Sequence, residues 1–228
     1  MNLLACGINH TAPLALREQL TFPPDYLAFF LRELLNETHA EEAMILSTCN
    51  RIEFYYINGD AQNTLDCLYR TKQLPKACLQ NYWYVYQREN ALRHILRVAS
   101  GLDSMILGEP QITGQLKTAF SFANSLGIAG AQFKRLFQYI FNVTKQVRQQ
   151  TEITSHPVSL AFALVSSAKH IFAQLADARV MLIGAGETVA LVAKHLVSQG
   201  IQHFLIANRS TKNARKLALA IGGQTIRL

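Results

Sequence analysis

The sequence predicts an α+β domain, which opens with a ferredoxin-like βαββαβ unit and continues as helices, followed by a shortened α/β domain of the Rossmann type. Three observations support this. Strand-like and helix-like segments alternate in the order β-α-β-β-α-β up to Tyr86. The segment from about Glu89 to Ala173 has mostly helical periodicity. A β-α-β-α series then begins at Arg179. We expect the two domains to span residues 1–153 and 154–228.

The elements of the first unit follow from apolar runs and from turn residues between them. Pro23-Pro24 suits the first turn of a helix, and leucine and phenylalanine recur after it at helical spacing. Asn58-Gly59-Asp60 is typical of a turn that ends a strand. The predicted elements are strand Leu3–Ile8, helix Asp25–Glu37, strands Ala43–Ser47 and Ile52–Ile57, a short helix around Asn63–Thr71, and an aromatic strand at Tyr82–Tyr86.

A predicted helix at Ala131–Gln150 is apolar on one face and basic beside it. Lys134, Lys145 and Arg148 fall within roughly 60° of each other at 100° per residue. These cations form either a solvated basic edge or a stripe that contacts phosphates. The sequence leaves both interpretations open.

The second domain is predicted from two parallel strand-turn-helix units. Its elements are helix Val158–Leu175, strands Arg179–Ile183 and His203–Ala207, a helix from Thr211, and the start of a third strand near Thr225. So small a parallel sheet leaves its faces uncovered. We therefore expect these 228 residues to be part of a longer natural chain.

Composition narrows the class of protein. Half of the 228 residues are hydrophobic, the net charge is +7 and the pI is about 9.4. A moderately basic chain suits a polyanion such as nucleic acid, although many enzymes are equally basic. The four cysteines include no CxxC pair, which argues against a zinc site, and no metal is expected. Without a signal peptide or a membrane-spanning segment, the sequence predicts a cytoplasmic protein with no membrane contact and with reduced thiols.

A glycine-rich turn follows the predicted strand Arg179–Ile183 and opens a helix. It reads Gly184-Ala185-Gly186-Glu187-Thr188-Val189-Ala190. Gly184 permits a tight turn, and Gly186 lets the backbone approach a pyrophosphate at the helix N-terminus. This context predicts dinucleotide binding, and the alternative is a purely structural turn.

The end of the next strand indicates which dinucleotide. A carboxylate is usual there when NAD is bound, but the sequence continues as Asn208-Arg209-Ser210 with Lys212 nearby. Arg209 suits a 2′-phosphate, so we predict NADPH rather than NADH. The alternative for Arg209 is a surface salt bridge.

Five polar residues, Ser47-Thr48-Cys49-Asn50-Arg51, interrupt two strands. An arginine two residues from a thiol favours the thiolate. A cysteine and a nicotinamide cofactor can together capture an acyl group as a thioester and reduce it to an aldehyde. The alternative, a small buried apolar residue, is what we expect for Cys6, Cys67 and Cys78.

Several motifs resemble those of the glutamyl-tRNA reductase family. They are STCNR at 47–51, GINHTAPLALRE at 7–18, RVASGLDSMILGEPQITGQLK at 97–117, and GAGET followed by IANR. The resemblance implies NADPH-dependent reduction of glutamyl-tRNA to glutamate-1-semialdehyde, the first step of five-carbon tetrapyrrole synthesis. The family also has the rest of its NADPH domain, a spinal helix and a dimerisation domain, which are absent here. The N-terminal motif is one residue shorter than the family's NHKTAPV.

The same resemblance implies residue roles. Cys49 would be the nucleophile, and His94 would do acid–base or activating work beside it. Arg51 would hold the substrate carboxylate bidentately. The implied substrate-binding residues are Thr48, Asn50, Arg51, Ser104, Glu109, Pro110, Gln111 and Gln115. The implied cofactor-binding residues are Gly184, Ala185, Gly186, Glu187, Thr188, Val189, Asn208, Arg209 and Ser210, with Ser159 and Lys212 as further candidates.

Implied partners are glutamyl-tRNA, an aminomutase that takes the reactive aldehyde, and a second copy of the full-length chain in a homodimer.

Spacing alone leaves other roles open: His94 could be a packed histidine of an amphipathic helix, and Asp103 and Ser104 could be turn residues. Two rival functions also remain. A shikimate-dehydrogenase-like NADP oxidoreductase would not need Cys49, and a tRNA-binding module would show no chemistry.

Overall fold

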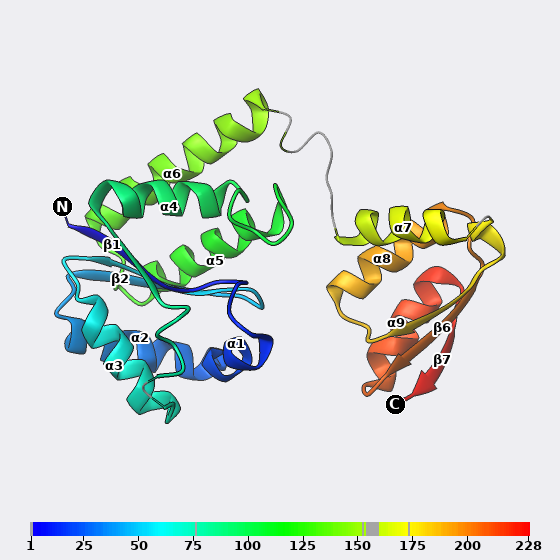
Figure 1. Cartoon of the computed structure of the whole chain (residues 1–228), viewed down its shortest axis with the longest axis horizontal. Coiled ribbons are helices and arrows are strands. Elements are labelled where there is room, and N and C mark those ends of the chain that lie inside the picture. Colours follow the sequence, from blue (N-terminus) through cyan, green and yellow to red (C-terminus); the bar gives the residue numbers. More distant parts are fainter. Residues whose placement is uncertain (1, 76, 152, 154–159, 173) are drawn as a thin grey trace. The chain divides into compact units, whose positions relative to one another are not determined.

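The computed structural model describes residues 2–75, 77–151, 153, 160–172 and 174–228. The chain divides into two compact units, residues 1–156 and 157–228, which are treated separately below (Figure 1). The domain boundary predicted after residue 153 adjoins residues outside the described ranges, so it stays a prediction.

The first unit contains a four-stranded antiparallel sheet in the order β2-β3-β1-β4. Its strands are β1 (Leu3–Ile8), β2 (Glu42–Ser47), β3 (Ile52–Ile57) and β4 (Tyr84–Gln87). Strand β4 begins later than the predicted Tyr82, because the amides of Tyr82 and Trp83 both bond to the Leu79 carbonyl in a turn. The mixed α/β class and the βαββαβ order are confirmed.

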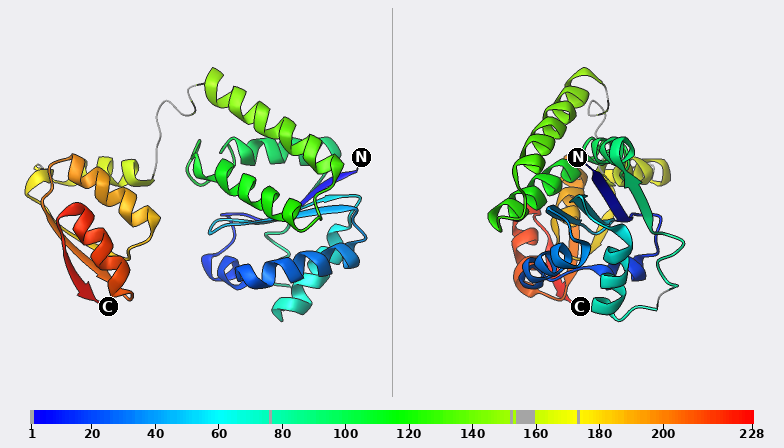
Figure 2. Two further views of the ribbon diagram at one scale, coloured as in Figure 1. Left: turned by 180° about the vertical axis from the view of Figure 1, so that it is seen from behind. Right: turned by 90° about the vertical axis from the view of Figure 1, so that its left-hand side faces the viewer.

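Helices cover both faces of this sheet (Figures 1 and 2). On one face lie α1 (Leu14–Leu20), α2 (Pro24–Thr38) and α3 (Ala61–Lys72); on the other lie α4 (Arg88–Ala99), α5 (Gln111–Ser125) and α6 (Ala131–Gln150). Burial from both sides explains why β1 and β3 are almost continuously apolar instead of alternating. Helix α1 was not predicted, because its seven residues are too few for a clear periodic signal.

A buried carboxylate fixes the start of α6. Glu42, on β2, accepts hydrogen bonds from the amides of Gly130 (2.9 Å), Gln132 (3.0 Å) and Phe133 (2.7 Å). These amides have no partner within the helix itself, so Glu42 serves as a cap supplied from the sheet. The contact ties α6 to the strand that leads into the predicted nucleophile loop.

The second unit is a three-stranded parallel sheet in the order β5-β6-β7. Its elements are α7 (Leu160–Ile171), a 3₁₀ turn (Leu175–Asp177), β5 (Arg179–Ile183), α8 (Glu187–Ser198), β6 (His203–Asn208), α9 (Thr211–Ile221) and β7 (Gln224–Arg227). The helix predicted at Val158–Leu175 therefore ends early, and residues 158 and 159 lie outside the described ranges.

One face of this parallel sheet is open in the part of the chain that the structure describes. Met181 and Ile183 are 54% and 68% exposed, whereas Leu182 between them is buried. Because neighbouring residues of a strand point to opposite faces, the helices of this unit cover only one face. The uncovered apolar face agrees with the expectation for so small a sheet.

Candidate active site

The polar segment predicted to carry the nucleophile is a hairpin loop. The β2–β3 ladder closes at Ser47 and Ile52, which leaves residues 48–51 as the connection. The Thr48 amide donates to the Arg51 carbonyl (2.9 Å), and the Thr48 hydroxyl accepts from the amides of Asn50 and Arg51 (3.2 and 3.1 Å). These bonds hold the loop at the end of two rigid strands.

Arg17, on α1, ties this loop to the rest of the unit. Its Nη1 donates to the Cys49 carbonyl (2.6 Å) and to Asn50 Oδ1 (2.9 Å), while its Nε donates to the Ala12 carbonyl. Cys49 is an exposed free thiol. Cys6 and Cys67 are buried as expected, whereas Cys78, for which burial was also expected, is only half-buried. Arg17 was missed at the sequence level because it belongs to the helix that was not predicted.

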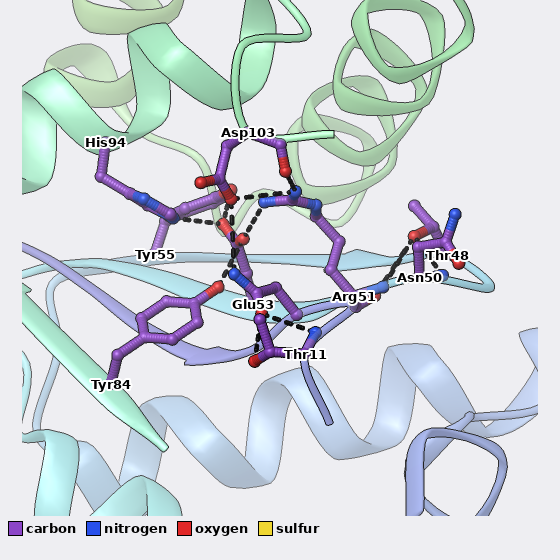
Figure 3. A network of polar contacts seen from close by, with 10 residues as sticks. Thr11, Thr48, Asn50, Arg51, Glu53, Tyr55, Tyr84, His94 and Asp103 are labelled. Atoms are coloured by element: carbon purple, nitrogen blue, oxygen red, sulfur yellow. Dashed lines mark hydrogen bonds and ion pairs between the residues drawn. The ribbon is translucent and has the colours of Figure 1, made fainter. Parts of the chain in front are cut away.

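Arg51 turns inward from the loop and is only 2% exposed. Its Nη1 lies 2.5 Å from Glu53 Oε1, and its Nη2 lies 3.1 Å from Asp103 Oδ2 (Figure 3). Nη2 also donates to the Asp103 carbonyl. Two carboxylates therefore offset the positive charge that the sequence led us to expect beside the thiol of Cys49.

Glu53 is the centre of this network and is completely buried (Figure 3). Besides Arg51, its carboxylate accepts from the hydroxyls of Tyr55 and Tyr84 (2.6 Å for Tyr84) and lies 3.1 Å from His94 Nε2. Burial would raise the pKa of Glu53, but the His94 hydrogen bond and the Arg51 charge outweigh it and lower the pKa to about 2. Glu53 is thus a stable buried anion.

His94, on α4, is 6% exposed and is held in place by Glu53 and by two aromatic rings. Its ring stacks on Tyr86 with centroids 4.7 Å apart and meets Tyr84 edge-on at 5.2 Å. In Figure 3, His94 stands at the opposite end of the network from Thr48 and Asn50, with Glu53 and Arg51 between them. The structure thus connects His94 to the nucleophile loop through the network.

A loop closed by two glycines carries Asp103 and Ser104. Gly101 and Gly108 have φ of +76° and +77°, and the Gly108 amide donates to the Gly101 carbonyl (2.9 Å). Among the described residues, the buried Ser104 Oγ has no hydrogen-bond partner. His10 Nδ1 is a second buried atom without a partner in the described part of the chain.

The other predicted substrate-binding residues lie at the start of α5, outside the Arg51 network. Pro110 precedes the helix, and Gln111 and Gln115 are exposed on its first turns. The Glu109 carbonyl accepts from Arg148 Nη2 (2.9 Å). Arg148 is therefore engaged within the unit, which leaves Lys134 and Lys145 as the exposed members of the predicted basic stripe on α6.

The glycine turn of the second unit fits a diphosphate. Gly184 has φ of +105°, and its amide donates to the Ala207 carbonyl (2.7 Å), so the turn sits between β5 and β6. A Cβ added to Gly186 would meet nothing within 4 Å. No side chain among the described residues caps α8, so its first amides can serve an anion.

Polar residues occupy the last position of β6 and the surface segment that follows it in the second unit. The Asn208 side chain donates to the Ser210 carbonyl (2.9 Å), and Arg209, Ser210 and Lys212 are exposed. Ser159 and the side chain of Glu187 lie outside the described part.

In the residues that the structure describes, no group of three or more His, Cys, Asp or Glu could hold a metal. No described helix is long and apolar enough to cross a membrane.

Comparison with known families decides the assignment of the first unit. Residues 6–151 match the family described as the N-terminal domain of glutamyl-tRNA(Glu) reductase. The chain belongs to the glutamyl-tRNA reductase family. Residues 166–228 of this reductase-family chain match the shikimate/quinate 5-dehydrogenase family. Both assignments imply a nicotinamide dinucleotide as the cofactor class.

Individual relatives agree with the family assignment. The chain is 46% identical to a glutamyl-tRNA reductase of Coxiella burnetii (strain Dugway 5J108-111) and 48% identical to one of Marinobacter nauticus, in each case over the whole chain. It covers 55% and 54% of those proteins, so it spans about half the length of the curated relatives it matches. The solved glutamyl-tRNA reductase from Methanopyrus kandleri is similar with a TM-score of 0.63 and 32% identity, over 99% of this chain and 54% of that one.

Proposed function

We propose that this chain carries the acyl-transfer site and part of the NADPH site of an enzyme that reduces glutamyl-tRNA to glutamate-1-semialdehyde and releases tRNA. This is the first step of five-carbon tetrapyrrole synthesis. The observation that carries the proposal is the exposed thiol of Cys49 on a hairpin loop anchored by Arg17, next to the buried cation Arg51.

In the proposed reaction, Cys49 Sγ attacks the carbonyl carbon of the glutamyl ester. The bond between this carbonyl carbon and the oxygen of the terminal ribose breaks. The ribose oxygen takes up a proton, and tRNA leaves with a free hydroxyl group. Thr48, Asn50 and Arg51 hold the glutamyl group, with Arg51 binding its carboxylate. When bound, NADPH supplies the hydride that reduces the thioester to the aldehyde. The thiolate of Cys49 is then restored.

The second unit would hold the cofactor. The turn from Gly184 to Gly186 lets the backbone approach the diphosphate at the start of α8, where Glu187, Thr188 and Val189 follow. Arg209, with Ser210 and Lys212, supplies positive charge and a hydroxyl suited to a 2′-phosphate. These residues support NADPH as the specific cofactor.

His94 is proposed for acid–base work, as the family resemblance implies. Its Nε2 is bound to Glu53 in this structure, so this nitrogen could act directly at Cys49 only after leaving that carboxylate. A positioning role through Glu53 and Arg51 requires no such movement.

The product aldehyde is reactive, which supports direct transfer to an aminomutase. A homodimer of the longer protein and a cytoplasmic location are further parts of this proposal.

A thioester trap tests the proposed function. The chain is mixed with glutamyl-tRNA that carries labelled glutamate, without NADPH, and is then quenched in acid. We expect hydroxylamine-labile label on the wild type and on the matched control Cys78→Ser, but none on Cys49→Ser. Label on Cys49→Ser would exclude Cys49 as the nucleophile. Bound tRNA with no label on any variant would favour a tRNA-binding module.

A further inference from the structure

We propose that Asp103 occupies the position on Arg51 that the substrate carboxylate takes, so that substrate binding exchanges one carboxylate for the other. This inference rests on the proposed function and concerns the same site. The exchange is ionic: no covalent bond forms or breaks, and Arg51 stays paired with an anion throughout.

The two carboxylates on Arg51 are held very differently. Glu53 is completely buried and is fixed by Arg51, His94 and two tyrosine hydroxyls. Asp103 is 22% exposed, and its other side-chain contact, from Asn9 Nδ2, is 3.5 Å long. The Asp103 carboxylate can therefore leave the guanidinium toward solvent while the Asp103 carbonyl keeps its bond to Arg51 Nη2, whereas the Glu53 carboxylate cannot leave.

The loop that carries Asp103 is exposed along much of its length between two glycines. Gly101 and Gly108 close its neck in a left-handed conformation that favours glycine. Leu102, Met105 and Leu107 between them are 38%, 68% and 62% exposed, so the loop has few apolar anchors. Loops with few buried contacts open at a low cost in free energy.

Charge balance makes exchange the expected way for an anion to enter. Arg51 is a single cation that already faces two carboxylates. A third carboxylate in this buried place would have no counter-charge, which is unfavourable at low local dielectric. An incoming carboxylate can bind only if Asp103 leaves.

Two residues next in sequence to the Asn9–Asp103 contact each carry a buried polar atom that has no partner among the described residues. Ser104 Oγ follows Asp103 in the chain, and His10 Nδ1 follows Asn9. A buried polar atom without a hydrogen bond is unfavourable, and a bound polar ligand would relieve this. The chain next to Asn9 and Asp103 thus carries two polar atoms that lack partners, in addition to the anion that can be replaced.

The test measures single-turnover acylation of Cys49 by glutamyl-tRNA in the whole chain. Asp103→Ala removes the internal competitor, so the glutamyl-tRNA concentration for half-maximal rate should fall about tenfold, equivalent to about 1.4 kcal/mol, and the maximal rate should change by a smaller factor. Asp103→Asn should act in the same direction. Asp66→Asn, which removes an exposed acid on α3, is the matched control and should change neither parameter.

A second measurement observes the loop itself. Hydrogen exchange of residues 101–108 should become faster when wild-type Cys49 carries the glutamyl group. An unchanged or raised half-maximal concentration in both Asp103 variants, or unchanged exchange, would overturn the inference and make Asp103 a fixed support of Arg51. A wild type that is never acylated would instead refute the proposed function, and this inference with it.

Discussion

At the scale of single residues, the site depends on one buried anion. Replacing Glu53 by Gln leaves Arg51 in an ion pair only with Asp103, whose side chain is 22% exposed. Breaking a buried ion pair in this way should lower the free energy of unfolding by about 3–5 kcal/mol. The single tryptophan, Trp83, lies in the first unit, so its fluorescence during denaturant unfolding reports on that unit. Glu18→Gln, an exposed control on α1, should have little effect.

The pH dependence of stability tests the same carboxylate independently. The pKa of Glu53 is lowered from 4.5 to about 2 in the folded state. Its contribution is therefore fully present above pH 4.5 and is lost as the pH falls toward 2. Wild type should lose up to about 3 kcal/mol over this interval through Glu53, a loss that Glu53→Gln lacks. Parallel pH profiles for the two proteins would contradict this.

Much of this residue-level arrangement could not be read from the sequence. The polar loop that holds Thr48, Asn50 and Arg51 is predicted by its interruption of two strands, but the roles of these residues in substrate binding are implied only by the family resemblance. The contacts of Arg51 with Asp103 and of His94 with Glu53 join residues 52 and 41 positions apart, which no local pattern reveals. The one available signal was Glu53 itself, a lone charge inside the apolar strand IEFYYI.

At the scale of elements, prediction worked where the periodic signal was long. Helix α6 has the predicted bounds, Ala131–Gln150, because its apolar face repeats over many turns. Strand β5 was also predicted with the right bounds, from its continuous apolar run. Helix α1 is a short segment, and β4 begins directly after a turn. Both features give a weaker periodic signal in the sequence. The roles of the predicted site residues stay predictions.

Substitution of Gly7 in β1 tests whether β1 and β3 must lie too close together at this position to admit a side chain. Gly7 pairs with Glu53, has φ of +154°, and an added Cβ would lie 2.2 Å from the Ile52 carbonyl oxygen. Gly7→Ala should therefore lower the free energy of unfolding by about 2–4 kcal/mol. Gly114→Ala is the matched control: its Cβ meets nothing within 4 Å on α5, so it should be neutral or stabilising by about 1 kcal/mol. Equal effects of the two substitutions on Trp83-detected unfolding would contradict this.

At the scale of the whole molecule, the net charge of +7 could attract the proposed tRNA substrate either generally or through one surface. Helix α6 presents Lys134 and Lys145 to solvent, while Arg148 is engaged with the Glu109 carbonyl. If these lysines contact phosphates, Lys134→Glu with Lys145→Glu should weaken tRNA binding more than the lost net charge alone would.

The control for this experiment makes the same charge change elsewhere. Lys194→Glu with Lys216→Glu alters two exposed lysines of the second unit. Anisotropy of labelled tRNA, titrated between about 50 and 200 mM salt, gives the affinity and its salt slope. The α6 variant should lose about two units of that slope, one for each phosphate contact, and the control should keep it. Equal losses in both variants would mean that only net charge acts and that α6 is a solvated basic edge.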